Sequence, residues 1–302
     1  MSKANLKDTT SRDKGSLDEF ERDWDAAFTK KLDRYHIYPT DAPTTQFEMF
    51  EMMKSKLVMD ILAEAGLSRS KVLEYGCGAA GMSIYLANQG FQVVACDLSV
   101  KALKIAKYNS DRHLSSDTKQ NLSSLRADAF NLPFQDNSFD IVMSYGLLEH
   151  LSLEPLRQML VSVVRVLRPG GLFIADIAHG RFSLRTVGIW LNLCGSVIYH
   201  FVKLDWRNLS SIPKAYLDHY YENDLDKQAW EAELNHRGLR ITQSKVCHPL
   251  PPLALKGSPE HLYVALMRES QSAWEWYHRV QPTWGRNLGW LYLVSGTKNE
   301  NE

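Results

Sequence analysis

The sequence predicts an α/β fold built on a doubly wound, mostly parallel sheet. Five short apolar runs alternate with stretches in which apolar residues recur at helical spacing, as strands and helices do in βα units. A glycine-rich turn joins the first run to the helical stretch behind it, and carboxylates follow the second and third runs. Right-handed crossovers would give three layers, with a ligand at the carboxyl ends of the strands.

The elements can be placed in order from residue 46. A helix is expected over 46–65, where Gly66 ends it. The expected strands are 71–75, 91–96, 122–127, 140–144 and 171–176. Helices are expected between them at 81–89, 99–110 and 153–167, with Ser99 as an N-terminal cap. Residues 1–15 show no apolar periodicity and are expected to be a flexible terminus.

The βα rhythm stops after Asp176. Residues 186–202 carry no Lys, Arg, Asp or Glu, and they predict an apolar helix with one polar stripe, formed by Asn192, Ser196 and His200. Regular patterns then predict a helix over 224–236, a strand over 239–246, a helix over 259–279 and a strand over 290–295.

Composition excludes several classes of protein. The 302 residues include 35 Lys and Arg against 35 Asp and Glu, so a polycationic nucleic-acid binder is not expected. Four cysteines without ligand spacing suggest neither a disulfide framework nor a metal site. Residues 1–20 are polar, which argues against a signal peptide and favours a cytoplasmic protein.

The segment GCGAAG at 76–81 suggests a nucleotide cofactor. It fits G-x-G-x-x-G, and Asp97 follows 21 residues after Gly76, as in dinucleotide-binding proteins. Glycines let the backbone approach a ligand, and a carboxylate at the end of the second strand can accept hydrogen bonds from ribose. An NAD(P)-linked oxidoreductase therefore competes with other adenosine-cofactor enzymes.

Other residues favour a different cofactor. Glu74 would repel a pyrophosphate but suits the ammonium of a methionine moiety. Asp128 and Ala129 follow the third strand, YGLLEH at 145–150 ends the fourth, and RPGG at 168–171 turns a helix into the fifth.

Together these residues resemble the class I S-adenosylmethionine (SAM)-dependent methyltransferases, particularly the small-molecule group that includes the ubiquinone and menaquinone C-methyltransferases. The resemblance covers 46–176 and extends through 224–236 to two terminal strands, which look like the family's antiparallel sixth and seventh strands. It implies a seven-stranded Rossmann-like sheet with an α-helical lid inserted after the fifth strand. The family's third glycine is replaced here by Ala80, with Gly81 one place later, which puts the loop geometry in question.

On this resemblance the chain divides into four parts. These are an N-terminal flap at 1–45, a SAM-binding core at 46–176, a helical lid at 177–222 and the rest of the core at 223–302. The last part would hold a helix, two antiparallel strands and an intervening helix.

The resemblance also implies residue roles. Glu74, Gly76 and Gly78 match the SAM loop, Asp97 the ribose acid, and Asp128 with Ala129 the adenine contact. The full set of expected cofactor contacts is Glu74, Gly76, Cys77, Gly78, Asp97, Leu98, Asp128, Ala129 and Tyr145.

Methyl transfer from a sulfonium needs alignment and exclusion of water more than a catalytic group. Where the acceptor must lose a proton, His150 and His179 are the candidate general bases, since each follows a strand end and histidine has a suitable pKa. The alternative for the pair formed by Glu149 and His150 is to anchor the following helix.

The insertion after Asp176 is the expected specificity region for a small, apolar or aromatic acceptor. Its apolar helix at 186–202 has three open roles: covering an oily acceptor, peripheral contact with a membrane, or core packing against Trp274, Trp276 and Tyr277. A non-catalytic SAM-binding subunit is a further alternative.

Overall fold

The computed structural model of the protein describes residues 25, 38–178, 184–203, 225–248, 253, 258–282, 289 and 291–300. In this part of the chain, seven strands form one sheet in the order β3-β2-β1-β4-β5-β7-β6. Their bounds are β1 Lys71–Tyr75, β2 Gln92–Asp97, β3 Leu122–Arg126, β4 Phe139–Ser144, β5 Leu167–Ala178, β6 Leu239–Val246 and β7 Leu291–Lys298.

The first five strands are parallel, as the alternating pattern predicts. Val72 of β1 lies between Val93 of β2 and Ile141 of β4. β7 runs antiparallel to both β5 and β6, so β6 points the same way as the first five strands. The expected seven-stranded, mostly parallel α/β sheet is confirmed.

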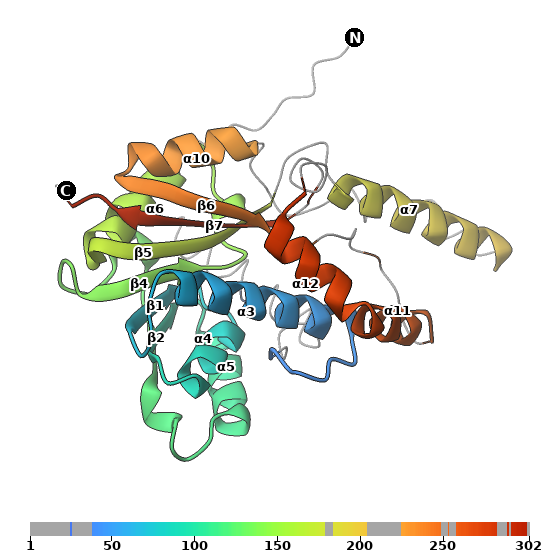
Figure 1. Ribbon diagram of the computed structural model, residues 1–302, viewed down its shortest axis with the longest axis horizontal. Helices are drawn as coiled ribbons and strands as arrows, with labels where there is room; N and C mark the ends of the chain where they lie inside the picture. Colours follow the sequence, from blue (N-terminus) through green and yellow to red (C-terminus); the bar gives the residue numbers. More distant parts are fainter. Residues whose placement is uncertain are drawn as a thin grey trace, which may run out of the picture.

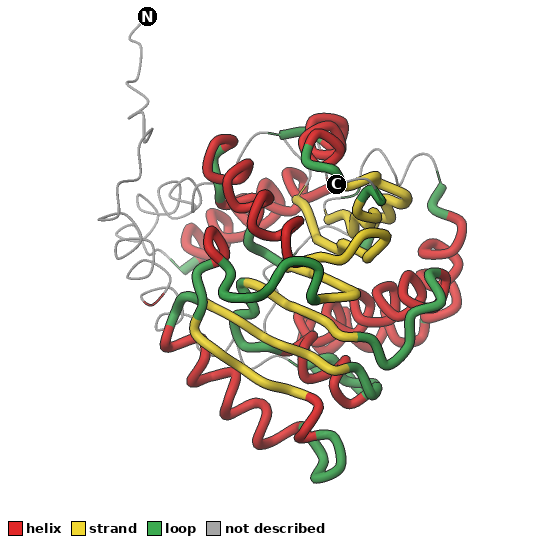
Figure 2. The backbone as a smooth tube through the Cα atoms, turned by 90° about the vertical axis from the view of Figure 1, so that its left-hand side faces the viewer, coloured by secondary structure: helices red, strands yellow, loops and turns green. Residues whose placement is uncertain are grey.

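Helices cover both faces of this sheet (Figures 1 and 2). One face carries α3 (Gln46–Glu64) and α4 (Gly81–Asn88), whose apolar side chains pack with Val72 and Ile141. The other face carries α6 (Leu153–Val166) and α10 (Lys227–His236), which pack with Leu73 and Phe173. Because successive strand residues point to opposite faces, one apolar run supplies both cores. The remaining α-helices are α5 (Val100–His113), α7 (Leu184–Val202), α11 (Ser258–Glu269) and α12 (Gln271–Val280).

The strand order changes direction between β1 and β4, which places a ligand site at their carboxyl ends. The loop at 76–80 follows β1, and the segment 145–147 follows β4. The sheet therefore brings the glycine-rich loop next to the end of the fourth strand.

Two expected elements differ in detail. The single helix expected over 259–279 is wrong, because the chain breaks at Ser270 into α11 and α12. The indole N–H of Trp274 donates to the Met267 carbonyl at 3.1 Å, and both side chains pack against α3. The fifth strand begins at Leu167 rather than at Gly171, and its pairing with β4 shifts register before Leu172.

In the expected N-terminal flap, residues 1–24 and 26–37 lie outside the described part of the chain. In the expected lid, residues 179–183 and 204–222 also lie outside it. The helix α7, which belongs to the expected lid insertion, extends away from the rest of the described chain (Figure 1). No helix in the described part of the chain combines the length and apolar character needed to cross a bilayer.

Candidate cofactor site

The loop at 76–80 has the backbone geometry that its glycines permit. Gly76 and Gly78 have φ angles of +64° and +52°, which glycine adopts without steric cost. A Cβ atom on residue 76 would lie 2.6 Å from Leu147 Cδ2, so the segment after β4 also requires glycine there. The N–H of Cys77 donates to the Cys96 carbonyl at 3.0 Å and anchors the loop to β2.

Ala80 stands where the family usually has its third glycine, and it keeps the turn that a glycine would make. It adopts the left-handed conformation, with φ +57°, and its side chain is fully buried at the start of α4. Such a conformation costs an alanine about 1–2 kcal/mol. The loop therefore keeps its tight turn without the glycine, at a local cost in strain.

Asp97 holds the loop and the next helix at the same time. Its Oδ2 accepts from the Gly78 N–H at 2.8 Å, and its Oδ1 accepts from the Ser99 N–H at 2.8 Å. Burial raises the pKa of Asp97, and these backbone hydrogen bonds oppose that shift. A carboxylate has about four acceptor positions, so these backbone donors leave room for a ribose hydroxyl. The ribose role of Asp97 stays a prediction.

Glu74 is buried at the end of β1, behind the loop. Its Oε2 accepts a short hydrogen bond from the Ser83 hydroxyl on α4. Burial raises the pKa of Glu74 to about 7, although Ser83 and the Lys54 ammonium oppose the shift. Near neutral pH this carboxyl group is therefore poised between its two protonation states.

Lys54 of α3 is the cation beside these carboxylates. Its Nζ lies 2.8 Å from Glu51 Oε1 and 3.6 Å from Asp176 Oδ2. It also lies 5.1 Å from the centroid of the Tyr145 ring. Burial opposes the charged form of Lys54, yet the two carboxylates raise its pKa above the ordinary value.

Asp176 connects the ends of β4 and β5. Its Oδ1 accepts from the Gly146 N–H at 2.6 Å. Burial raises the pKa of Asp176, and Lys54 lowers it. We call Glu51, Lys54, Glu74 and Asp176 the acidic cluster. When all four are ionised, three carboxylates against one ammonium leave two negative charges in excess. That excess favours a bound cation, such as an ammonium or a sulfonium.

The other predicted cofactor contacts follow the second and third strands. Asp128 caps a short 3-10 helix, Ala129–Asn131, by accepting from the Phe130 N–H at 2.9 Å. Leu98 follows β2, and its carbonyl accepts from Arg126 Nε at 3.0 Å. Asp128 therefore has a structural role, and its adenine contact stays a prediction.

The two candidate bases differ in what the structure shows. His150 ends the 3-10 helix Leu148–His150 and is half-buried, while Glu149 beside it is buried. His179 lies outside the described residues. Neither assignment as a base is tested by this geometry.

Sequence reasoning missed Lys54 and Ser83. Lys54 lies four residues after Phe50 and four before Val58, on the apolar face of the expected helix at 46–65. A charged residue in a buried apolar stripe requires a partner, and that signal could have identified it. Ser83 offers no comparable signal, because its contact with Glu74 depends on how α4 packs on β1.

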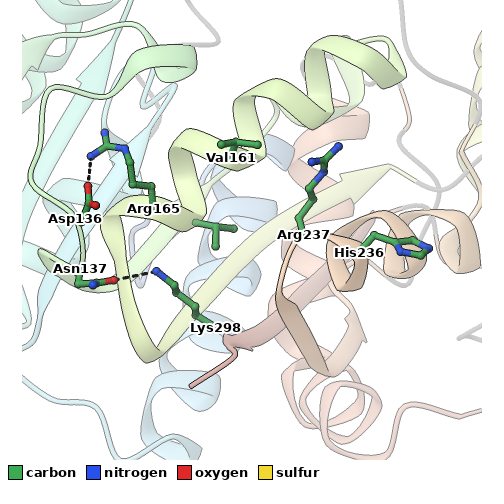
Figure 3. A pocket seen from close by; sticks show the side chains of 8 residues that line it. Asp136, Asn137, Val161, Arg165, His236, Arg237 and Lys298 are labelled. Atoms are coloured by element: carbon green, nitrogen blue, oxygen red, sulfur yellow. Dashed lines mark hydrogen bonds and ion pairs between the residues drawn. The ribbon is translucent and has the colours of Figure 1, made fainter. Parts of the chain in front are cut away.

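A groove of about 380 Å³ lies at the opposite edge of the sheet (Figure 3). It is lined by Asp136, Asn137, Val161, Val164, Arg165, His236, Arg237 and Lys298. It lies where β4 begins and β7 ends, so it is far from the carboxyl ends of the parallel strands.

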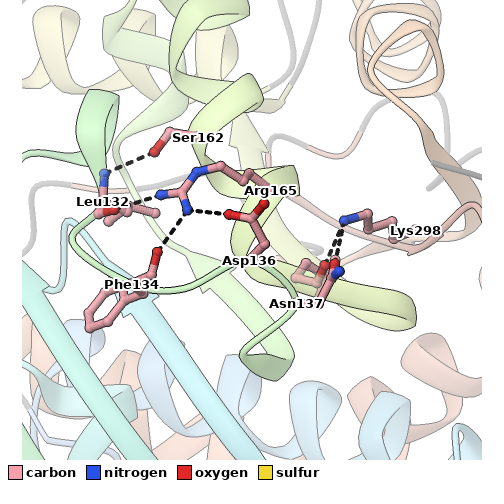
Figure 4. A network of polar contacts seen from close by, with 8 residues as sticks. Leu132, Phe134, Asp136, Asn137, Ser162, Arg165 and Lys298 are labelled. Carbon is pink, nitrogen blue, oxygen red and sulfur yellow. Dashed lines mark hydrogen bonds and ion pairs between the residues drawn. The ribbon is translucent and has the colours of Figure 1, made fainter.

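Internal contacts engage Arg165, Asp136 and Lys298 of that groove (Figure 4). The Arg165 guanidinium donates to Asp136 and to the Phe134 and Leu132 carbonyls, each at 2.7 Å. Lys298 Nζ donates to Asn137 Oδ1 and to the Leu167 carbonyl, each at 2.9 Å. These contacts link the segment before β4 to α6 and β7, so we assign them a structural role.

The described residues thus combine a β3-β2-β1-β4-β5-β7-β6 sheet with a glycine loop, an acid after β2 and a buried acidic cluster. Residues 73–175 match the family described as a methyltransferase domain, and the expected resemblance to the class I SAM-dependent methyltransferases is therefore confirmed.

Two groups of known proteins are similar to this chain. A demethylmenaquinone methyltransferase of Paenarthrobacter aurescens (strain TC1) is 35% identical over 149 residues, which are 49% of this chain and 52% of that protein. A demethylmenaquinone methyltransferase of Corynebacterium glutamicum (strain R) is 32% identical over 166 residues, 54% of this chain and 63% of that protein. The chain thus spans between about half and two thirds of these relatives' length.

The similarity to solved structures concerns the fold. The magnesium protoporphyrin IX methyltransferase from Synechocystis PCC 6803, with bound SAH, superposes with a TM-score of 0.55 at 14% identity, covering 92% of this chain and 99% of that chain. A sarcosine dimethylglycine methyltransferase from Galdieria sulphuraria gives 0.54 at 12% identity, over 93% and 99%.

Proposed function

We propose that this protein transfers a methyl group from SAM to a small, apolar or aromatic acceptor. The observation that carries the proposal is the joint position of three features at the switch point of the sheet. These are the loop at 76–80, the loop-bound carboxylate of Asp97 and the acidic cluster behind the loop. The loop, Asp97 and Glu74 fall inside the matched residues 73–175, whereas α3 and Asp176 lie just outside them.

The residues present suit SAM. Its sulfonium and ammonium are cations, and the acidic cluster has negative charge in excess. Asp97 would hold a ribose hydroxyl, and Asp128 with Ala129 would meet the adenine. A dinucleotide-binding sheet has the order 3-2-1-4-5-6, whereas here an antiparallel β7 lies between β5 and β6. This difference favours a methyltransferase over an NAD(P)-linked oxidoreductase.

SAM supplies an activated methyl group when bound. Transfer would form a bond between the acceptor atom and the methyl carbon as the carbon–sulfur bond breaks, and the sulfur would keep the electron pair of the broken bond. The chain's own residues align the two molecules and exclude water. If the acceptor atom carries a proton, His150 or His179 takes it.

Several observations support an apolar or aromatic acceptor. Two relatives, at 35% and 32% identity, are named demethylmenaquinone methyltransferases, and a quinone is such a compound. The balance of 35 acidic and 35 basic residues also favours a neutral acceptor. Peripheral membrane contact through 186–202 belongs to the same proposal, since an acceptor of this kind partitions into lipid.

A methyl-transfer assay tests the function. Protein is incubated with isotopically labelled SAM and either a reduced, prenylated naphthoquinone or polar amines and carboxylic acids. We expect the label in the quinol product, identified by mass. Label only in polar acceptors would contradict the acceptor class, and binding of S-adenosylhomocysteine (SAH) without transfer to any acceptor would favour the non-catalytic subunit.

Three histidine variants test the base. His150→Ala and His179→Ala are compared with His236→Ala, which alters an exposed histidine at the far edge of the sheet. We expect at least one of the first two to lose about 10²-fold or more in kcat. Full activity in both would show that neither is the base.

A further inference from the structure

The helix α7 presents an apolar face to solvent. Its most exposed large side chains include Trp190, Ile198 and Phe201, with 61%, 62% and 58% of their surface accessible. The exposed positions share one side of the helix and are Val187, Trp190, Leu191, Cys194, Val197, Ile198, Phe201 and Val202. Monomeric proteins rarely leave a continuous apolar face of this kind uncovered.

The polar stripe of the same helix faces the other way. Asn192 and Ser196, which lie four residues apart, are half-buried together with Ile189 and Leu193, while the large apolar residues on the other side of the helix are exposed. A surface helix of a water-soluble protein normally has the opposite arrangement. Core packing of this face against Trp274 is not what the structure shows, because Trp274 packs against α3 instead.

Charge indicates what covers this face. No Asp or Glu occurs between Asp176 and Asp205, whereas Arg181, Arg185 and Lys203 fall in that interval. Lys203 is exposed directly after the helix. A strip with only positive charge at its ends and aromatic residues along its apolar face matches an anionic bilayer surface.

The position of the helix supports the same partner. α7 extends outward as a ridge from the described chain (Figure 1), and a ridge can sink into a deformable lipid surface. It begins six residues after β5 ends, and β5 ends at the edge of the sheet that carries the acidic cluster.

We propose that α7 lies along an anionic lipid bilayer, with its face from Val187 to Val202 inserted among the lipids. This inference rests on the proposed function, because it explains how an apolar acceptor reaches the site. An acceptor dissolved in the bilayer enters beside the carboxyl end of β5 without crossing water.

Vesicle sedimentation tests the proposal. The full chain is mixed with vesicles of phosphatidylglycerol and phosphatidylcholine, or of phosphatidylcholine alone. Ile198→Asp alters the proposed surface, and Phe201→Asp repeats the change one turn away. Val161→Asp is the matched control, since Val161 is 55% exposed on α6, which lies away from α7 (Figure 1). We expect both α7 variants to bind anionic vesicles about tenfold or more weakly, and the control to bind as the parent does.

Two kinds of result would contradict the lipid contact of α7. Equal vesicle binding by the parent and both α7 variants, or no binding by the parent, would overturn the proposal. A parent that is dimeric in solution, and becomes monomeric in Ile198→Asp, would show that a second copy covers this face instead. SAH titration and methyl transfer to a detergent-dissolved quinol test the proposed function without any bilayer. Their outcome is therefore independent of the lipid contact of α7. Vesicle binding without any methyl transfer would defeat the proposed function and leave the lipid surface standing.

Discussion

The backbone N–H of Gly78 donates to Asp97 Oδ2 across 2.8 Å, which ties the loop after β1 to the end of β2. The same carboxylate accepts from Ser99 and so also fixes the start of α5. A single half-buried side chain thereby sets the relative position of three segments around the candidate site.

Asp97→Asn should weaken SAH binding by about 1–3 kcal/mol, roughly 5- to 150-fold, because an amide cannot accept from both backbone donors and a ribose hydroxyl. Calorimetric titration measures the affinity. Asp140→Asn is the control, since Asp140 accepts from the Lys71 N–H at the opposite edge of the sheet. A loss of thermal stability in Asp97→Asn with unchanged SAH affinity would rule out the ribose contact.

Gly76→Ala should destabilise the protein by about 1–3 kcal/mol more than Gly66→Ala. Both glycines have φ angles near +65°, so both variants suffer the same backbone strain. Only residue 76 would also place a Cβ atom 2.6 Å from Leu147, whereas nothing lies within 4 Å at residue 66. Urea unfolding measures the difference, and equal losses would show that Leu147 yields without cost.

SAH affinity should depend on pH through Glu74, whose pKa is about 7. Below that pH the carboxyl group is protonated and cannot pair with the cofactor's ammonium. Affinity should therefore fall by up to about tenfold per unit as pH decreases below 7, and level off above it. Titrations between pH 5.5 and 8.5, roughly one and a half units either side of that pKa, cover the transition.

Glu74→Gln should abolish this slope and bind more weakly at high pH. It should also change stability in a fixed direction. The folded protein holds the Glu74 proton between the ordinary value of 4.5 and about 7, so this group lowers stability as pH rises through that window. The Gln variant should then gain stability relative to the parent at pH 8 more than at pH 5. An identical pH slope in both proteins would assign the effect to another group.

Lys54→Met should cost about 3–5 kcal/mol of stability, because it leaves the buried Asp176 and the half-buried Glu51 without their cation. Lys56→Met on the same helix is the matched control. The Lys56 side chain is 34% exposed against 9% for Lys54, and its pair with Glu275 is superficial. We expect about 0–1 kcal/mol there. Similar losses in the two variants would mean that the acidic cluster is not an ion-paired unit.

The strands and helices could be predicted because hydrophobic periodicity is a local property. The strand at 239–246 and the helix start after Ser99 are placed where the sequence indicates. The break at Ser270 could not be predicted, since apolar spacing continues through it and the packing of Met267 and Trp274 against α3 is a tertiary feature.

The site was predictable where its residues lie next to strand ends. The structure places Glu74 and Asp97 at the ends of β1 and β2, and Asp128 two residues after β3, as that rule expects, while their roles toward a cofactor stay predictions. Lys54 comes from a helix that precedes the first strand, so its contact with Asp176 depends on packing over 122 residues of chain. The orientation of α7 could not be predicted from the sequence either. The pattern at 186–202 predicts an apolar face and a polar stripe, but not which of the two is exposed to solvent.

The central claim is that the switch point of the sheet binds SAM, and one competition of ligands tests it most directly. The purified chain is titrated by calorimetry with SAH and, separately, with NADH. We predict saturable one-to-one binding of SAH and none of NADH. Binding of NADH alone would contradict the account.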